Sequence, residues 1–107
     1  MPDVSPLDLF RTIVRLRASG DQRPCIVLSE PRNGRVLLAP LSSALDLYSP
    51  TLHFLIRDDH PDFKATGLTK TSYVIGNELR DSPVELLGDH LGRFEGELAG
   101  EFKKWIG

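Results

Sequence analysis

The chain has 107 residues, of which 40% are hydrophobic and 26% charged, so we expect one globular domain over residues 1–107 with a single modest core. No apolar run is long enough to span a bilayer, and the opening MPDVSPLDLF lacks the parts of a secretory signal, so the cytoplasm is the expected compartment, without a membrane partner. The single cysteine excludes an internal disulfide, and the net charge of −2 argues against a nucleic-acid binder, although residues 1–40 hold six arginines against four acids.

Strand patterns dominate the first three quarters of the sequence. The segment 11–17 is rich in β-branched residues, although Ser5-Pro6 before it is also compatible with a helix start. The run CIVL is continuously apolar, as expected of a strand that is buried on both faces. The predicted strands are residues 11–17, 25–28, 35–41, 51–56 and 71–75.

Asn33-Gly34 is the strongest turn signal, because both residues tolerate a positive φ. A two-residue turn there predicts that Cys25 lies opposite Ser42, and that Arg23 and Ser42 share one face of the hairpin. A phosphate would fit between that guanidinium and that hydroxyl. Solvated strand ends are the alternative. Pro40 also suggests a bulge, which would bring Ser43 onto the same face instead.

The end of the sequence changes to helical patterns. Ser82 and Glu85 form a capping box around Pro83, which predicts a short helix over residues 83–91. Apolar residues then recur at helical spacing and predict a last helix that ends at Gly107. We therefore expect an α+β, mainly β fold, with about five antiparallel strands and one or two helices covering the sheet.

Other polar residues give weaker signals. The three histidines His53, His60 and His90 are scattered without metal-ligand spacing, and RDDHPD has no recurring ligand pattern, so no metal site is predicted. His53 is a candidate general base, with a structural role as the alternative. Cys25 lies close to Arg23 in the sequence, which favours a lowered thiol pKa, but a buried packing role is the stronger expectation.

Several short motifs resemble the MazF/PemK family of type II toxin–antitoxin ribonucleases, in its PemK-like branch. They are a strand rich in Val and Arg, then RPCIVLS, APLSS, ATGLTKTSYVIGNEL and HLGRF…WIG, which together span about residues 9–107. The resemblance implies a small SH3-like antiparallel β-barrel with a C-terminal helix, which forms a homodimer. It also implies a cognate antitoxin as partner, and metal-independent cleavage of single-stranded RNA through the 2′-hydroxyl, without a cofactor.

The resemblance also assigns site residues. Arg23 matches the family arginine that stabilises the phosphorane or donates a proton, and Ser42 matches the Ser or Thr that hydrogen-bonds the phosphate. We take Arg23 and Ser42 as the predicted catalytic residues. The predicted substrate-binding residues are Ser43, Arg15, Arg17 and His53.

The sequence departs from the family pattern at four places. Phe10-Arg11 replaces the Gly-Asp that usually opens the first strand, and Ala44 replaces the usual Gln. Ile75 and Asn77 stand where some members have Arg and Asp, so no general base is identified. A same-fold protein that does not cleave RNA is therefore the alternative, either a CcdB-type gyrase inhibitor or a degenerate protein-binding module.

The tryptophan near the C-terminus bears on that alternative. CcdB-like proteins depend on a Trp near the C-terminus, and Trp105 invites the comparison. Trp105 also fits the apolar stripe of the last helix, and a core role is the stronger expectation.

Overall fold

The computed structural model describes the backbone of residues 4–16 and 19–107, and the side chains of residues 4–13 and 22–107. It contains β-strands and one α-helix, α1 (Gly96–Ile106), joined by short 3₁₀ turns. The strands are β1 (Asp8–Leu16), β2 (Ser19–Val27), β3 (Arg35–Ser42), β4 (His53–Ile56), β5 (Ser72–Ile75), β6 (Arg80–Pro83) and β7 (His90–Arg93). The predicted mainly β fold with a C-terminal helix is confirmed.

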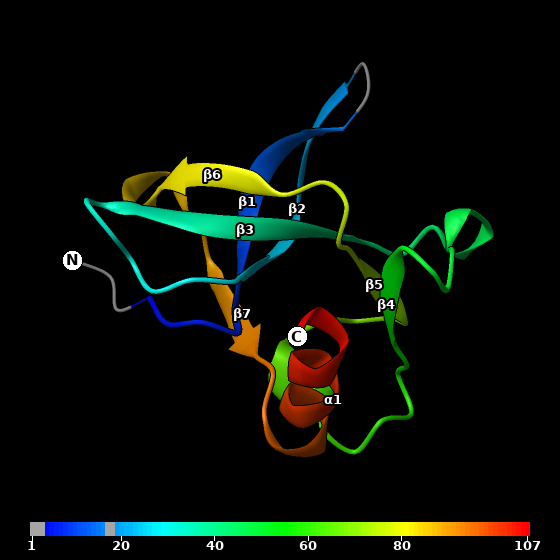
Figure 1. The fold of residues 1–107 in the computed structure, drawn as a ribbon. Coiled ribbons are helices and arrows are strands. Elements are labelled where there is room, and N and C mark those ends of the chain that lie inside the picture. Colours follow the sequence, from blue (N-terminus) through cyan, green and yellow to red (C-terminus); the bar gives the residue numbers. More distant parts are fainter. Residues whose placement is uncertain (1–3, 17–18) are drawn as a thin grey trace.

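The strands form one curled antiparallel sheet, a half-barrel, with the order β4-β5-β3-β2-β1-β7. β3 is the central strand: β6 pairs with its first half and β5 with its last residues, on the edge opposite β2. β1 and β2 project as a long hairpin away from α1, which packs against the other end of the sheet (Figure 1). β7 pairs with β1, so a late segment completes the edge beside an early one.

Alternate residues of the central strands supply two hydrophobic clusters. Leu9 and Ile26 belong to the cluster beneath α1, together with Phe94, Leu98 and Phe102. On the other face of the sheet, a second cluster comprises Val4, Phe10, Cys25, Val27, Val36, Leu38 and Val84. Because both faces of β2 are covered, its apolar run does not alternate with polar residues, as predicted for CIVL.

The hairpin register differs from the prediction by two residues. The turn forms at Asn33-Gly34, with φ of 53° and 73° and a bridge between Arg32 and Arg35. Cys25, however, pairs with Pro40 and not with Ser42. The segment 29–31 contains a proline and adds two unpaired residues, and the hydroxyl of Ser29 accepts the N–H of Leu37 (3.0 Å) in place of a backbone partner. Because the shift is even, each residue keeps its predicted face.

The predicted helix over residues 83–91 is wrong. That segment forms the end of β6, a 3₁₀ turn at Val84–Leu86 and the start of β7. Ser82 Oγ donates to the carbonyl of Pro83 (3.1 Å), and no side chain caps the turn. The first half of β3 has an open edge that β6 fills, and the backbone N–H of Val84 donates to Gly34 (2.8 Å). Tertiary pairing therefore overrides the local capping signal.

The last helix begins two residues later than its apolar pattern suggests, and a distant loop caps it. Asp62 Oδ2 accepts the N–H of Leu98 in the first turn (3.2 Å). Trp105 stacks on Phe102 and lies against Gly76, where a Cβ would be 2.4 Å from the indole ring. Trp105 thus has the packing role that its spacing predicts.

The first strand begins three residues earlier than the predicted strand over residues 11–17. β1 begins at Asp8, and the preceding Leu7 has a φ of 77°, a conformation that favours glycine. Asp8 is buried, lies 3.5 Å from the Arg93 guanidinium and accepts the N–H of Ser5.

Candidate functional site

A cavity of about 510 Å³ opens where the end of β3 lies near the middle of β2 and the loop before β5. β1 and β2 supply Arg11, Gln22, Arg23 and Pro24, and the end of β3 supplies Leu41, Ser42, Ser43 and Ala44. A second wall consists of Gly67, Leu68, Thr69, Lys70, Ser72 and Leu91. Its volume falls in the range of small-ligand sites. We call it the cationic pocket.

The charges that line the cationic pocket all have one sign. Arg11, Arg23 and Lys70 are its ionisable groups, and hydroxyls come from two of its walls. Among the described lining residues none carries a carboxylate or an imidazole. Such a set of donors suits a multiply charged oxyanion, and phosphate is the common biological example.

Arg23 lies in the middle of β2 and is held by the strands on both sides. It pairs with Thr12 of β1, and its Nη1 donates to the carbonyl of Leu41 on β3 (3.4 Å). The side chain is half-buried, beside the fully buried Cys25. The guanidinium is therefore directed along the end of β3, where Ser42 lies, as the hairpin analysis predicted.

The hydroxyl pair lies where β3 leaves the sheet. Ser42 Oγ accepts the N–H of Ala44 (3.1 Å), and Tyr73 donates its hydroxyl hydrogen to the carbonyl of Ala44 (3.0 Å). These two bonds fix the backbone turn, so that both Ser42 and Ser43 line the cationic pocket. The sequence left open whether Ser42 or Ser43 would lie at the site, and in the structure both serines line the pocket.

Close backbone contacts position the second wall. A Cβ at Gly67 would lie 2.0 Å from the carbonyl oxygen of Leu91, and one at Gly92 would lie 2.1 Å from that of Ala65. The loop after the 3₁₀ turn Lys64–Thr66 therefore packs directly on β7. Ser72 Oγ then donates to the carbonyl of Lys70 (2.8 Å) and secures the segment that carries the lysine.

Cys25 lies behind the cationic pocket as a packing residue. Burial raises the pKa of its thiol from 9.0 to about 12, although Arg23 and Arg80 act in the opposite direction. Desolvation of a thiolate thus outweighs the neighbouring positive charges. The expected packing role is in agreement with this burial, and the thiol is not a nucleophile.

The remaining predicted site residues lie elsewhere. His53 is not among the lining residues: its ring stacks on Tyr73 at 4.6 Å, and its Nδ1 accepts the N–H of Ser49 (2.9 Å). Arg15 lies in β1, beyond the described side chains, and Arg17 lies outside the described residues. The structure thus brings Arg23, Ser42 and Ser43 together, and does not place His53 with them.

Sequence reasoning missed the other two cations of the pocket. Arg11 was noted only as a departure from a family motif, and Lys70 only as part of a longer match. The available signal for Lys70 was its place in the polar run TKTS just before β5, at a strand end where side chains meet neighbouring loops. The contact of Gly67 with Leu91 brings this loop to the pocket, and no local pattern in the sequence indicates that contact.

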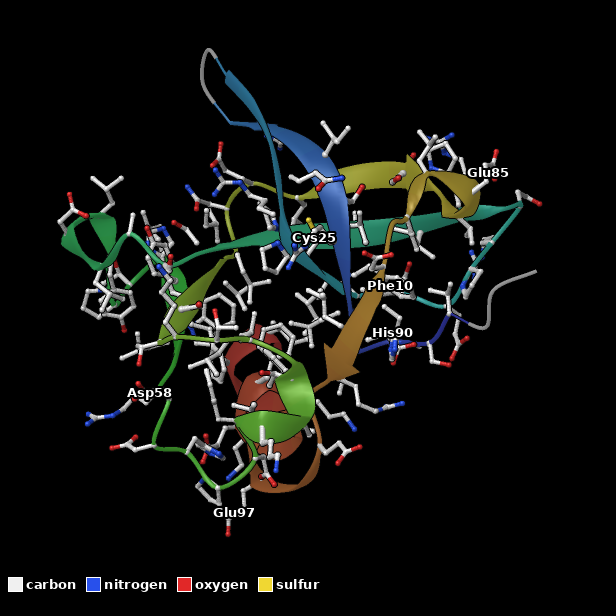
Figure 2. All side chains as sticks on the ribbon, turned by 180° about the vertical axis from the view of Figure 1, so that it is seen from behind. Phe10, Cys25, Asp58, Glu85, His90 and Glu97 are labelled. Carbon is white, nitrogen blue, oxygen red and sulfur yellow. The ribbon has the colours of Figure 1, made fainter. Side chains whose placement is uncertain are left out.

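One further cluster has the composition of a metal site. His60, Glu97 and Glu101 bring potential ligand atoms within 4.8 Å of one another. Glu97 lies at the bottom of the view in Figure 2, well away from Cys25 in the sheet. His60 Nδ1 accepts the N–H of Asp62 (3.0 Å), so Nε2 carries the proton and donates to Glu101 (3.2 Å). The histidine therefore links a loop to α1.

None of the helices in the described part of the chain has the length and apolar character needed to cross a membrane.

Comparison with known proteins gives matches among solved structures alone. No family model matches the sequence, and no curated protein is similar enough to count as a relative. One similar structure is an endoribonuclease from a mycobacterial species (TM-score 0.67, 16% identity, covering 96% of this chain and 86% of that one). Another is such an endoribonuclease in complex with its cognate antitoxin (TM-score 0.67, 17% identity, 99% and 91% covered).

A third similar structure is the Mycobacterium tuberculosis toxin MazF-mt6 (TM-score 0.66, 20% identity, 96% and 93% covered). The identities of these matches are low, so the likeness establishes the fold. The chain has the MazF-like fold that the sequence resemblance predicted.

Proposed function

We propose that this protein, whose fold is that of MazF-type endoribonuclease toxins, cleaves single-stranded RNA as the toxin of a type II toxin–antitoxin pair in the cytoplasm. The observation that carries the proposal is the cationic pocket, in which Arg23 meets Ser42 and Ser43 with two further cations and no described acid. Solved structures with this fold include endoribonucleases. The pocket also has the positive charge that stabilises a phosphodiester during cleavage.

The proposed chemistry uses the RNA's own nucleophile. The 2′-hydroxyl oxygen attacks the adjacent phosphorus and leaves a cyclic phosphate. Arg23 stabilises the negative charge that develops on the non-bridging oxygens, and Ser42 donates a hydrogen bond to the same phosphate. The guanidinium and ammonium groups supply the positive charge that the transition state needs, and the proposed reaction uses no metal ion.

The test is induced expression in a bacterium, followed by mapping of new RNA 5′ ends. We expect growth arrest together with new ends, and the purified protein should produce the same ends on naked RNA in the presence of EDTA. Growth arrest without new RNA ends would overturn the endoribonuclease proposal.

The second candidate is a protein of the same fold that binds without cutting, either a CcdB-type gyrase inhibitor or a protein-binding module. The observation in its favour is that no described lining residue is a carboxylate or a histidine, the usual general bases. Its signature would be tight, salt-dependent binding of an RNA that stays intact through long incubation.

The proposal includes two protein partners, an antitoxin and a second copy of the chain. The cationic pocket predicts that the antitoxin offers an acidic, partly disordered segment, which folds on binding and competes with RNA. Association should therefore slow as salt rises, and a rate constant insensitive to ionic strength would contradict this account of the partner.

A further inference from the structure

The cationic pocket contains a proton donor for the leaving group. Resting on the cleavage reaction proposed above, we infer that Lys70 is its general acid, and that its ammonium protonates the 5′ oxygen as the phosphodiester bond breaks. Cleavage without a metal ion leaves an alkoxide at that oxygen, and an alkoxide departs readily only when a proton reaches it.

Elimination among the lining side chains identifies the lysine. The described ionisable groups of the pocket are Arg11, Arg23 and Lys70. A guanidinium stabilises charge but keeps its proton in proteins, whereas an ammonium releases one to a strong base. The hydroxyls of the pocket are far weaker acids than an ammonium. Arg23 therefore suits the non-bridging oxygens and Lys70 suits the leaving oxygen.

The position of Lys70 supports the same role. Its backbone is secured by the bond from Ser72 and by the contact of Gly67 with β7, so the wall that carries it is fixed. Its side chain is exposed and lines the same pocket as Arg23 and Ser42, two residues before β5, whose Tyr73 pairs with Ser42. The pocket thus offers both an anion-stabilising group and a proton donor to one bound phosphate.

The step balances in atoms and charge. The 2′ oxygen forms a bond to phosphorus and its proton passes to a solvent water molecule or hydroxide ion. The bond from phosphorus to the 5′ oxygen breaks, and that oxygen keeps the electron pair and takes a proton from Nζ of Lys70. The neutral amine then regains a proton from solvent.

The test compares two leaving groups in one oligoribonucleotide that carries a cleavage site mapped in wild-type reactions. One version has the natural 5′ oxygen at that site, and the other has a 5′-bridging sulfur, which leaves as a thiolate without needing a proton. Lys70→Arg keeps the charge but removes a usable acid. We expect it to slow cleavage of the oxygen substrate by about 10²–10⁴-fold and cleavage of the sulfur substrate by only a few-fold.

The ratio of the two rates within one protein sample does not depend on how much of the variant is folded. Lys64→Gln is the matched control, because Lys64 is exposed on the neighbouring 3₁₀ turn and is not among the lining residues; it should cleave both substrates like wild type. A Lys70→Arg variant that cleaves the oxygen substrate normally, or slows both substrates equally, would overturn the acid role. A wild-type protein that yields no mappable cleavage site on any RNA would overturn the proposed function itself.

Discussion

Arg23 and Ser42 are the residues at which sequence and structure agree most closely. An arginine before a buried strand and a serine pair after the next one were enough to predict a shared face. The prediction held despite the register error, because a shift of two residues preserves side-chain direction. Lys70 was missed because its approach depends on a contact between backbones far apart in the sequence, which no local pattern records.

Substitutions at Arg23 and Ser42 should separate the effect of positive charge on the cleavage rate from the effect of the planar guanidinium geometry. Arg23→Ala should slow cleavage by about 10²–10³-fold, and Ser42→Ala by less, because a neutral hydroxyl stabilises charge less well. Arg23→Lys should not restore the rate, since an ammonium lacks the planar fork. Single-turnover cleavage rates measure all three. Arg57→Ala, in an exposed loop where Arg57 pairs with Asp59, should cleave like wild type.

Loss of activity in Arg23→Ala must also be distinguished from unfolding. The half-buried guanidinium donates to Leu41, so its loss should lower the free energy of unfolding by about 1 kcal/mol, which thermal denaturation will show. An Arg23→Ala protein that is folded and cleaves RNA at the wild-type rate would remove Arg23 from the catalytic site.

Cys25 predicts a pH dependence of stability. Its pKa is about 12 in the folded chain against 9.0 when exposed, so above pH 9 the unfolded thiol loses its proton while the folded one keeps it. The unfolded state is then favoured, and stability falls as pH rises from 9 towards 12. Between pH 8 and 10, wild type should lose about 1.4 kcal/mol more than Cys25→Ala in urea denaturation. Equal losses would show that burial does not perturb the thiol.

At the scale of elements, the structure shows where local signals suffice. The turn at Asn33-Gly34 and the helix with buried Leu98 and Phe102 formed as their patterns predict. The capping box at Ser82 did not produce a helix, because the open edge of β3 takes the same residues as a strand. No local pattern in the sequence reveals that open edge, because strand pairing joins segments that lie far apart in the sequence.

The cap on α1 gives a test of long-range contact between a loop and a helix. Asp62→Ala removes the carboxylate that accepts the N–H of Leu98, and should lower the free energy of unfolding by about 1 kcal/mol. Asp62→Asn keeps an acceptor and should lose less. Asp59→Ala, which removes an exposed carboxylate of the same loop, should change stability by less than about 0.5 kcal/mol. Equal effects of the Asp62 and Asp59 substitutions to alanine would exclude the cap.

Two exposed glycines should respond to alanine with opposite signs. Neither Gly100 nor Gly34 has a heavy atom within 4 Å of an added Cβ, so only the backbone distinguishes them. Gly100 lies inside α1, and Gly100→Ala should stabilise by roughly 0.5–1 kcal/mol. Gly34 has a φ of 73°, and Gly34→Ala should destabilise by roughly 1 kcal/mol. Chemical denaturation of both variants provides the comparison, and changes of the same sign would contradict it.

At the scale of the whole molecule, exposed apolar surface predicts a second copy. Leu79 and Ile106 are about half exposed and flank a cavity of about 310 Å³ that Trp105 also lines. Burying this surface in a homodimer would remove it from water. Light scattering at micromolar concentration should give twice the 11.9 kDa of the chain, and Leu79→Glu should shift the mass towards the monomer. Leu47→Glu, in an exposed 3₁₀ turn, is the control. A monomeric wild type would refute the homodimer.

The pairing of β7 with β1 has a consequence for protein synthesis. Asp8 faces Arg93 across that pair, and Leu91 of β7 also lines the cationic pocket and supports the loop that carries Lys70. A ribosome therefore has to release the chain through β7 before the two walls can meet. A chain that ends before the loop of Lys70 carries Arg23 and both serines without the second wall. If the product is toxic, the complete pocket cannot form until β7 has been translated. The cell therefore meets no active toxin before that point.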